Sequence, residues 1–468
     1  MEEEITYSKI VDKNLKNSVI EGVGNSCKVG FGESYISAFA IKIMNASNFQ
    51  IAFLASIPRF VGYLSDLFST NLLDKIKNRK RMISLGIIIS AFMLIPIFLS
   101  AFLPNFSAWL LILFATVYFL SDFIVVPIWI SLFGDIVPDK IKGEYFGKRN
   151  RYLGIAEFTS YFIGGLILYA FARINLLLGF GIIFGLALVS RIVSFVFLQK
   201  IYEPDYTIQE EDPFSFMDFF KKMGSTNYGL FVIYICLFTF SVQIAAPFFA
   251  VYMLKDLNFD FLTFTIVTSV AAVSGFLSMP LWGKYSDEFG NKKILSVTGI
   301  LIGSIPILWA LSTNLMYLVI VEVFAGFLWA GFNLSSFNFV YDTVSPEKRV
   351  RAVSYYRVLY GISIFVAPIL GAYLLNIKIT SWKPMIFILI LSGVLRLIFS
   401  LIFLPKIKEV KQVRTISEGE LVWSLLTVES IRGLMLPLMI IKRNAKKPKE
   451  VVDKIIDEIK HVMEKAKE

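Results

Sequence analysis

The sequence predicts an all-α polytopic membrane protein with about twelve transmembrane helices, arranged as two parallel six-helix repeats. Three observations support this prediction. The chain has 468 residues, of which 56% are hydrophobic and only 18% are charged, whereas soluble domains hold about 25% charged residues. The apolar residues gather in runs of about 20, the length that crosses a bilayer. The two halves of the chain also carry the same motifs in the same order.

The apolar runs place the expected membrane spans, and a polar stretch separates the sixth run from the seventh. We therefore divide the chain into a six-helix bundle (1–199), a cytoplasmic linker (200–226), a second six-helix bundle (227–405) and a cytoplasmic or interfacial tail (406–468). The expected spans are 19–44, 48–66, 82–103, 107–134, 152–173, 177–199, 227–254, 261–282, 294–312, 315–341, 354–376 and 384–404.

The tail contains two further helical patterns. Residues 421–441 are apolar, but Glu429, Arg432 and Pro437 interrupt them. This pattern favours a helix that lies in the membrane interface, and a thirteenth span is the alternative. Residues 450–467 repeat apolar side chains at helical spacing, which predicts a short amphipathic helix.

Basic residues set the expected orientation. They gather in the turns after spans 2, 4, 8 and 10, whereas the turns at the opposite ends of the spans are poor in them. Positively charged loops stay in the cytoplasm, so both termini are expected there, in the cytoplasmic membrane. Because the net charge of +10 comes from these loops, it predicts contact with the bilayer and no contact with nucleic acid.

Several kinds of chemistry have no signal in this sequence. The two cysteines, Cys27 and Cys236, lie far apart, and the single histidine is in the tail. No residues have metal-ligand spacing, and the Gly-rich loop that cradles nucleotide phosphates is missing. We therefore expect no enzymatic activity, no metal and no cofactor.

Short motifs repeat in the two halves. Gly62-Tyr-Leu-Ser-Asp66 precedes a basic cluster, and Gly283-Lys-Tyr-Ser-Asp287 precedes another. Residues 197–203 at the end of span 6 match residues 403–409 at the end of span 12. Matched prolines after spans 4 and 10 bring Arg149 and Arg357 into register. Repeats of one orientation imply an axis along the membrane normal.

With about twelve spans and a long central loop, this repeat resembles the major facilitator superfamily, whose signature is Gly-x-x-x-Asp-(Arg/Lys)-x-Gly-(Arg/Lys)-(Arg/Lys). The second copy matches the signature, although Glu288 stands where the family has a base and Asn291 shifts the bases by one position. The first copy carries an insertion before its bases. The segment 129–149 is similar to an uncharacterised prokaryotic subgroup. The matching residues are Gly62, Asp66, Arg79, Lys80, Arg81, Gly283, Asp287, Gly290, Lys292 and Lys293.

The resemblance implies a secondary active transporter, a symporter or antiporter, that moves a small organic solute by alternating access with proton coupling. It also implies that Asp66 and Asp287 lock the cytoplasmic side, with Arg149 and Arg357 as partners. We expect a monomer. The alternatives for these charges are solvation of the loops and determination of topology. The alternatives for the protein are a facilitative uniporter and a non-transporting sensor or partner-binding protein that uses the tail.

Polar residues within the spans are the other signal, since they are costly in lipid and normally face the protein interior or water. The resemblance implies a central cavity lined by spans 1, 4, 7 and 10. Asp122 and Glu33 are candidates for proton or cation binding, and Trp129 and Trp329 for stacking against solute. The predicted pathway residues are Glu33, Arg59, Asp122, Trp129, Gln243, Glu322, Trp329 and Asn333.

Internal pairing is the alternative for the intramembrane charges. Glu33 could pair with Arg59 or Lys28, and Asp122 with a base on another span. Lys28 and Glu33 are five positions apart, which places them on different faces of a continuous helix. Arg191 and Arg396, towards the inner ends of spans 6 and 12, are expected to extend to the membrane interface.

Overall fold

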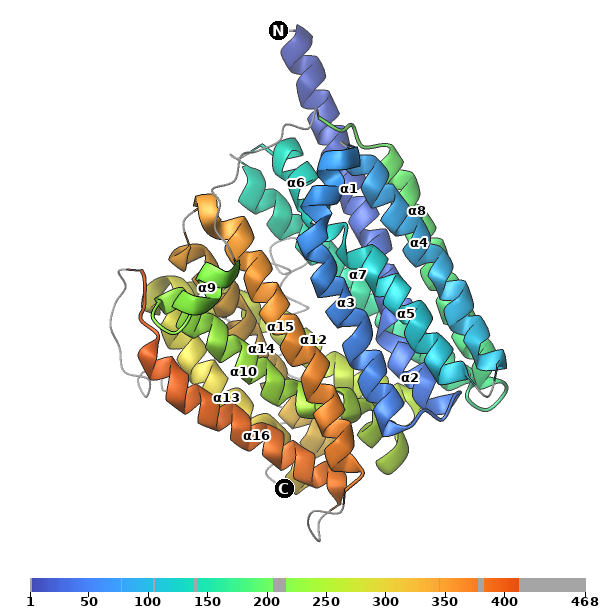
Figure 1. The fold of residues 1–468 in the computed structure, drawn as a ribbon. Helices are drawn as coiled ribbons and strands as arrows, with labels where there is room; N and C mark the ends of the chain where they lie inside the picture. The colour runs from blue at the N-terminus through green and yellow to red at the C-terminus, as the bar shows by residue number, and fades with distance from the viewer. Residues whose placement is uncertain are drawn as a thin grey trace, which may run out of the picture.

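The computed structural model describes residues 2–411 except for 77, 104–105, 139–140, 205–215, 345 and 378–382. The two helices predicted for the tail lie outside the described residues, as does the middle of the linker. The described residues form helices and connecting turns, and Figure 1 shows them gathered into two groups that follow each other along the chain.

The first group holds the elements of the predicted first repeat. A short 3-10 turn, Glu33–Tyr35, separates its first two helices. The helices are α1 (Glu2–Phe31), α2 (Ile36–Lys42), α3 (Asn48–Ile76), α4 (Arg79–Leu99), α5 (Ser107–Phe123), α6 (Val126–Ile136), α7 (Lys142–Phe171) and α8 (Leu176–Gln199).

The second group follows the short linker helix α9 (Phe216–Lys222). Its first span is again interrupted, by a 3-10 turn at Ala246–Phe248 and a π-helical turn at Tyr252–Asp256. Its helices are α10 (Asn227–Ala245), α11 (Phe249–Val251), α12 (Phe261–Phe289), α13 (Asn291–Leu311), α14 (Leu315–Thr343), α15 (Pro346–Leu375) and α16 (Pro384–Phe403).

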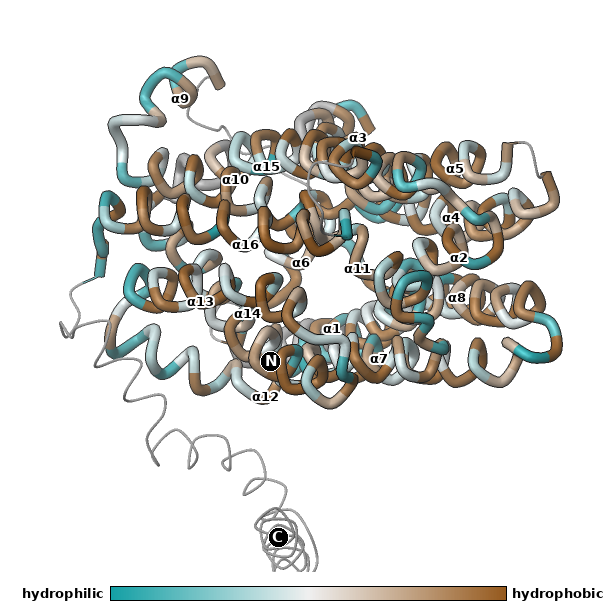
Figure 2. Tube along the Cα trace, turned by 90° about the horizontal axis from the view of Figure 1, so that it is seen from below, coloured by the Kyte–Doolittle hydropathy of each residue, from teal (hydrophilic) through white to brown (hydrophobic). Residues whose placement is uncertain are grey.

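The all-helical membrane fold is confirmed. Among the described residues, 10 helices are long and apolar enough to cross a membrane, and Figure 2 shows the packed helices as mainly hydrophobic along their length. The first two predicted spans correspond to α1 with α2 and to α3, which are helical but carry charges such as Lys28, Glu33 and Arg59. These charges lower the mean hydropathy of the two segments.

The repeat is also visible in the backbone at the ends of the first and seventh spans. Lys42-Ile-Met-Asn45 ends the first, and Lys255-Asp-Leu-Asn258 ends the seventh. Both asparagines have positive φ, 47° and 52°, a conformation that asparagine tolerates better than most residues. The same chain reversal is therefore built twice, at equivalent ends of the two groups.

The two groups meet along two seams. In one seam α3 packs against α15, and in the other α7 packs against α12. In the second seam, the hydroxyl groups of Tyr161 and Thr268 are 2.6 Å apart, and those of Tyr35 and Thr265 are 3.2 Å apart. These hydroxyl contacts join the two groups near the start of α12.

Candidate functional site

A cavity of about 830 Å³ lies between the two groups, with walls from α7, α12 and α14. Most of its wall is aromatic or aliphatic. Two of the predicted pathway residues, Trp329 and Asn333, line it from one face of α14, as their spacing of four positions requires. The polar side chains that join them are those of Ser34, Glu157, Tyr161, Thr268 and Ser269.

Glu157 brings a carboxylate to this cavity. Glu157 is exposed and lines the cavity, so its carboxylate is accessible from the cavity. Lys28 and Glu33 lie within electrostatic range of Glu157. Glu157 lies within the expected fifth span, 152–173, but it is not among the pathway residues predicted from the sequence. Its place in the wall depends on how α7 is rotated against α12.

The other predicted pathway residues lie outside the lining of this cavity. Trp129 stacks on Phe133 at 4.3 Å between ring centroids. Glu322 accepts a hydrogen bond of 2.8 Å from the indole nitrogen of Trp309. The Arg59 guanidinium lies 5.5 Å from the ring centroid of Phe119, and Gln243 is partly buried in α10.

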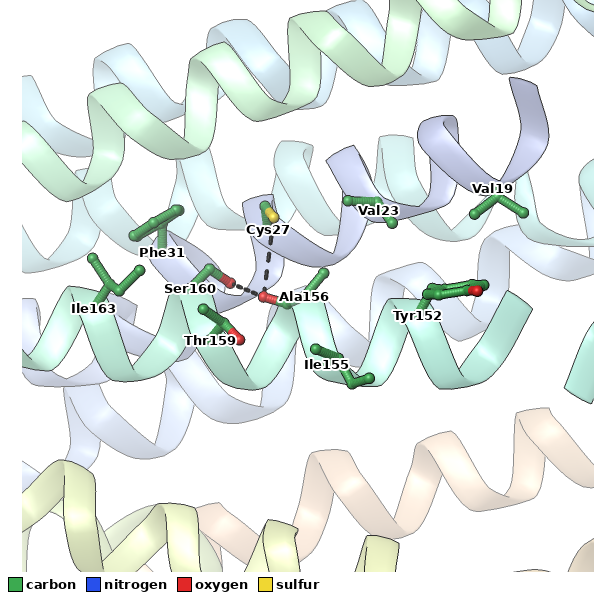
Figure 3. A pocket seen from close by; sticks show the side chains of 10 residues that line it. All are labelled: Val19, Val23, Cys27, Phe31, Tyr152, Ile155, Ala156, Thr159, Ser160 and Ile163. Carbon is green, nitrogen blue, oxygen red and sulfur yellow. Dashed lines mark hydrogen bonds between the residues drawn. The ribbon is translucent and has the colours of Figure 1, made fainter. Parts of the chain in front are cut away.

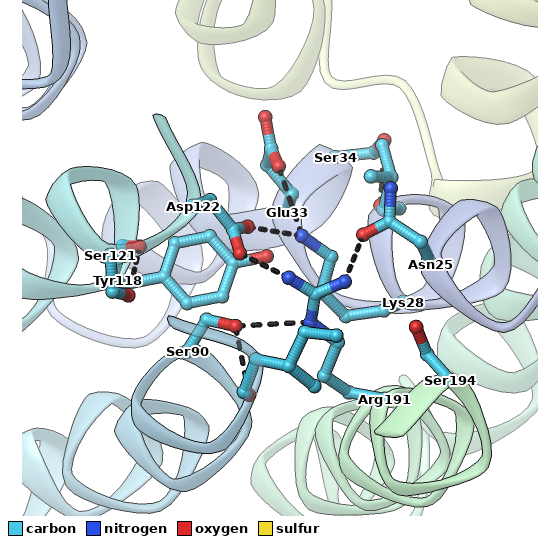
Figure 4. A network of polar contacts seen from close by, with 12 residues as sticks. Asn25, Lys28, Glu33, Ser34, Ser90, Tyr118, Ser121, Asp122, Arg191 and Ser194 are labelled. Carbon is cyan, nitrogen blue, oxygen red and sulfur yellow. Dashed lines mark hydrogen bonds and ion pairs between the residues drawn. The ribbon is translucent and has the colours of Figure 1, made fainter. Parts of the chain in front are cut away.

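A network of buried charges is centred on Asp122 (Figure 4). Its carboxylate accepts hydrogen bonds from Lys28 Nζ at 2.6 Å and from Arg191 Nη2 at 2.5 Å. Arg191 also donates to Asn25 Oδ1 at 2.6 Å and to Ser90 Oγ at 3.0 Å. The pairing of Asp122 with bases on other spans, one of the alternatives read from the sequence, is therefore confirmed as a contact.

Two expectations about intramembrane charges are wrong. Lys28 and Glu33 do not lie on different faces: Lys28 Nζ and Glu33 Oε2 are 3.8 Å apart, because α1 ends at Phe31 and the 3-10 turn changes the direction of Glu33. The alternative in which Glu33 pairs with Lys28 is therefore confirmed as a contact. Arg191 and Arg396 are only 4% and 3% exposed, so neither reaches the interface. Each turns into its own bundle, where Arg396 donates to Ser392 Oγ at 2.9 Å.

In each copy of the signature, a glutamate accepts hydrogen bonds from the backbone of the basic residues. Glu203 accepts hydrogen bonds from the backbone nitrogens of Arg79 at 2.8 Å and Lys80 at 3.3 Å. Glu409 accepts one from the backbone nitrogen of Lys292 at 2.8 Å. Carboxylates at these positions satisfy free N–H groups at the starts of α4 and α13 and complement the helix dipoles.

A second carboxylate completes each of these clusters. The buried Arg79 pairs with Asp135 at 2.5 Å, and Asn291 donates to Asp342 at 2.7 Å. Lys80 donates to the carbonyl oxygens of Gln199 and Ile201. The described polar contacts of these signature residues therefore join helices within one bundle.

The two glycines of the second signature copy have different surroundings. Gly290 has φ of +86°, and a Cβ there would clash with the Glu409 carboxylate, whereas a Cβ at Gly283 would meet nothing within 4 Å. In the first copy, a Cβ at Gly62 would clash with the ring of Phe123, so this glycine allows the ring to pack against the backbone of α3.

This difference gives a matched pair of substitutions. Gly290→Ala is expected to destabilise the protein by about 1–3 kcal/mol, because alanine disfavours positive φ and displaces the cap. Gly283→Ala is expected to be neutral or to stabilise by up to about 1 kcal/mol, because it sits within α12. Thermal unfolding of both variants in detergent measures the contrast, and equal stabilities would contradict it.

The structure describes the side chains of some residues of the predicted cytoplasmic lock. The side chain of Asp66 lies outside the described residues, and Asp287 is exposed. Arg149 pairs with Glu21 at 3.3 Å and lies 4.4 Å from the ring of Trp129, within the first bundle. Arg357 lies 5.3 Å from the ring centroid of Tyr63, across the seam between α15 and α3. The lock itself stays a prediction.

Two lysines that were not identified from the sequence join the two bundles at the end away from the signature residues. Each lysine contacts the other bundle. Lys42 Nζ donates to the Leu254 carbonyl oxygen at 2.7 Å. Lys255 Nζ donates to Asn45 Oδ1 at 2.9 Å. The repeated Lys-x-x-Asn motif was the available signal, since residues at equivalent positions of two repeats meet across their common axis. We call these contacts the lysine latch.

An apolar groove of about 390 Å³ runs between α1 and α7 (Figure 3). Ser160 donates to the Ala156 carbonyl oxygen at 2.7 Å, and the Cys27 thiol faces the same oxygen. Because these polar groups are used within the protein, the groove offers a mainly apolar surface.

Comparison with known proteins identifies the family. The family model described as "Major Facilitator Superfamily" matches residues 230–446, and that of the "MFS_1 like family" matches residues 35–261. The multi-drug resistance efflux pump PmrA of Streptococcus pneumoniae is 25% identical over 338 residues, 69% of this chain and 79% of that protein.

Other relatives match over shorter stretches. Multidrug resistance protein 3 of Bacillus subtilis is 28% identical over 138 residues, 29% of this chain and 26% of the relative. The chain spans between 26% and 30% of the length of this relative and three others.

Solved structures share the fold. The nucleoside transporter NupG aligns with a TM-score of 0.65 at 15% identity, over 84% of this chain and 99% of that one. A bacterial homologue of the iron transporter ferroportin aligns with a TM-score of 0.62 at 13% identity, over 85% and 98%. With the two family models, the helical fold and the repeated signature, these matches lead to one conclusion: the chain belongs to the major facilitator superfamily, whose members are multi-pass membrane transporters and not enzymes.

Proposed function

We propose that this protein is a secondary active transporter that moves a small organic solute across the cytoplasmic membrane by alternating access. The observation that carries the proposal is the cavity between the two repeats. The lysine latch joins the repeats at one end, and the cavity lies further along the helices from that end. The basic loops place both termini in the cytoplasm, so in this proposal the latch is extracellular and the cavity faces the cytoplasm. Two rigid bundles that rock about a central site then expose it to each side in turn.

The cavity wall favours an organic solute with a large apolar part. Trp329, Phe158 and Phe276 supply aromatic surface, and aliphatic side chains fill most of the remaining wall. Thr268 and Asn333 add hydrogen-bonding groups. Two of the similar proteins are named for multidrug resistance, which agrees with a pocket that holds solute mainly by apolar contact.

Proton coupling is assigned to Glu157. Its carboxylate faces a mainly apolar wall within a membrane span, where a charged group is costly unless a proton or a cation compensates it. Glu33 and Lys28 on the first span interact electrostatically with Glu157, and the described cavity lining from α12 and α14 adds no charged side chain. Protonation of Glu157 would therefore change the charge that the solute meets.

Glu157→Gln tests this proposal. We expect proton-driven accumulation of tetraphenylphosphonium in proteoliposomes to fall at least tenfold, because glutamine keeps the shape of the side chain but does not release a proton; this corresponds to about 1.4 kcal/mol or more. Glu157→Asp should retain part of the activity. Asp12→Asn, an exposed carboxylate near the start of α1, is the matched control.

The outcomes separate the alternatives. If Glu157→Gln accumulates the probe as the unchanged protein does, Glu157 has no part in coupling. If the unchanged protein equilibrates the probe without accumulating it against a gradient, the facilitative uniporter is correct. If it neither binds nor moves any organic solute, the transport proposal fails.

A further inference from the structure

The two seams between the bundles differ in how far they are closed. Along α3 and α15, Phe60 stacks on Phe365 with ring centroids 4.8 Å apart, and Tyr63 meets Tyr360 at 5.6 Å. The Arg357 guanidinium also lies over the Tyr63 ring. These contacts reach the middle of both helices, so this seam is closed by side chains there.

The seam between α7 and α12 is closed over a shorter length. Its described hydroxyl contacts lie near the start of α12, where Tyr161 of α7 meets Thr268 and Tyr35 meets Thr265. Further along the two helices, their side chains line the cavity, Glu157 and Phe158 from α7, and Val273 and Leu277 from α12.

An apolar groove lies beside the cavity at this place. It has a volume of about 610 Å³ and is lined by α7, α12 and α14. Four residues, Phe158, Ser269, Val273 and Leu277, line both the cavity and the groove. The two spaces therefore meet at a shared wall, which we call the α7/α12 portal.

The far side of the groove faces the bilayer. Its apolar side chains are strongly exposed, among them Ile320 at 63% and Val323 at 46%. Both lie within α14, a helix long and apolar enough to span the membrane. In a membrane protein, exposed apolar surface at this depth contacts hydrocarbon.

We propose that the α7/α12 portal is a side entrance through which an amphipathic organic cation passes between the bilayer and the cavity. The apolar part of the solute lies in the groove and against Trp329, and its cationic group meets Glu157. This inference rests on the proposed function and specifies its substrate class and its route. A phospholipid fits less well, because Glu157 repels its phosphate.

The chemistry of the route explains the composition of the portal. A membrane-dissolved cation moves its apolar part from hydrocarbon into apolar protein surface, a transfer with little cost. Its charge leaves the interface only when a carboxylate compensates it. Ser269 is the polar group of the portal, and Thr268 and Glu157 lie further in along the cavity wall.

Site-specific fluorescence tests both parts of the inference. Single cysteines are placed at Val273 in the portal, Asn333 in the cavity only and Ile266 in the groove only. Cys27 and Cys236 are first replaced by alanine. Each cysteine carries a bimane label, in liposomes that contain lipid with a nitroxide on its acyl chain. Quenching is recorded with and without tetraphenylphosphonium, a membrane-soluble cation.

We expect the nitroxide lipid to quench the labels at Ile266 and Val273 but not at Asn333. Tetraphenylphosphonium should remove the quenching at Val273, change the emission at Asn333 and leave Ile266 unaffected. Absence of lipid quenching at Val273, with quenching at Ile266, would overturn the portal.

The same experiment distinguishes failure of the portal from failure of the proposed function. If lipid quenches the label at Val273 but the cation changes neither Val273 nor Asn333, the cationic substrate class is wrong. If the cation changes Asn333 while Val273 is never quenched, the cavity binds the solute but admits it from water. That result would leave the transport proposal intact and overturn this inference.

Discussion

Replacing Asp122 by asparagine is expected to destabilise the protein by about 3–5 kcal/mol, because the substitution leaves the buried Arg191 without its carboxylate and Lys28 with Glu33 alone, 3.8 Å away. Lys28 and Arg191 have side chains that are 2% and 5% exposed, and Asp122 is 14% exposed. Water therefore does little to replace the lost charge. Thermal unfolding of the purified protein in detergent, followed by tryptophan fluorescence, measures the effect.

Asp135→Asn is the matched control for this substitution. Asp135 also pairs with a buried arginine, Arg79, but Asp135 is 49% exposed and Arg79 keeps a second carboxylate, Glu203, at 3.5 Å. The expected loss is therefore only about 1 kcal/mol. Combining Lys28→Gln with Asp122→Asn should cost less than the sum of the single changes, because one unpaired cation is removed with its partner.

The result also decides what Asp122 does. A large loss of stability in Asp122→Asn supports a structural ion cluster. A variant of unchanged stability that no longer accumulates solute would instead assign proton coupling to Asp122. Unchanged stability together with unchanged accumulation would contradict both roles.

Removing the lysine latch is expected to shift the protein towards the conformation that is open at the other end of the cavity. Each lysine contributes about 1 kcal/mol through a charge-assisted hydrogen bond at a partly exposed site. Lys42→Ala with Lys255→Ala should therefore change the ratio of the two conformations by about thirtyfold. Each single variant should give about half of this free energy.

Distances between spin labels at Phe49 and Asp256 measure this shift. Both residues are exposed and lie beside the latch in different bundles. We expect a longer distance to gain population in the double variant, and little change in Lys16→Ala, an exposed lysine of α1. An unchanged distribution in the double variant would show that other contacts hold this end closed.

The fold was predictable because the bilayer restricts the solutions. Runs of about 20 apolar residues can only be membrane helices, and the expected starts of α12 and α16 differ little from those in the structure. The glutamates that end the matching segments, Glu203 and Glu409, indeed cap equivalent helices. Local sequence was sufficient here because each helix satisfies its own backbone hydrogen bonds.

The candidate site was predictable only in part. Trp329 and Asn333 line the cavity as expected, but Trp129, at a similar place in the first repeat, packs against Phe133 and Arg149. The rotation of each helix about its axis decides which face meets the cavity. That rotation depends on packing against several neighbours, and helical spacing within one segment does not contain it.

The sequence by itself determined the family, the number of spans, the repeat and the existence of charges that had to be paired within the membrane. Only the tertiary structure decided the pairs: Asp122 with Lys28 and Arg191, Lys42 with Leu254, and Glu157 with the cavity. The physical reason is the range of the interactions. Span formation is local, whereas charge pairing joins residues that are distant in the chain and meet only when the helices pack.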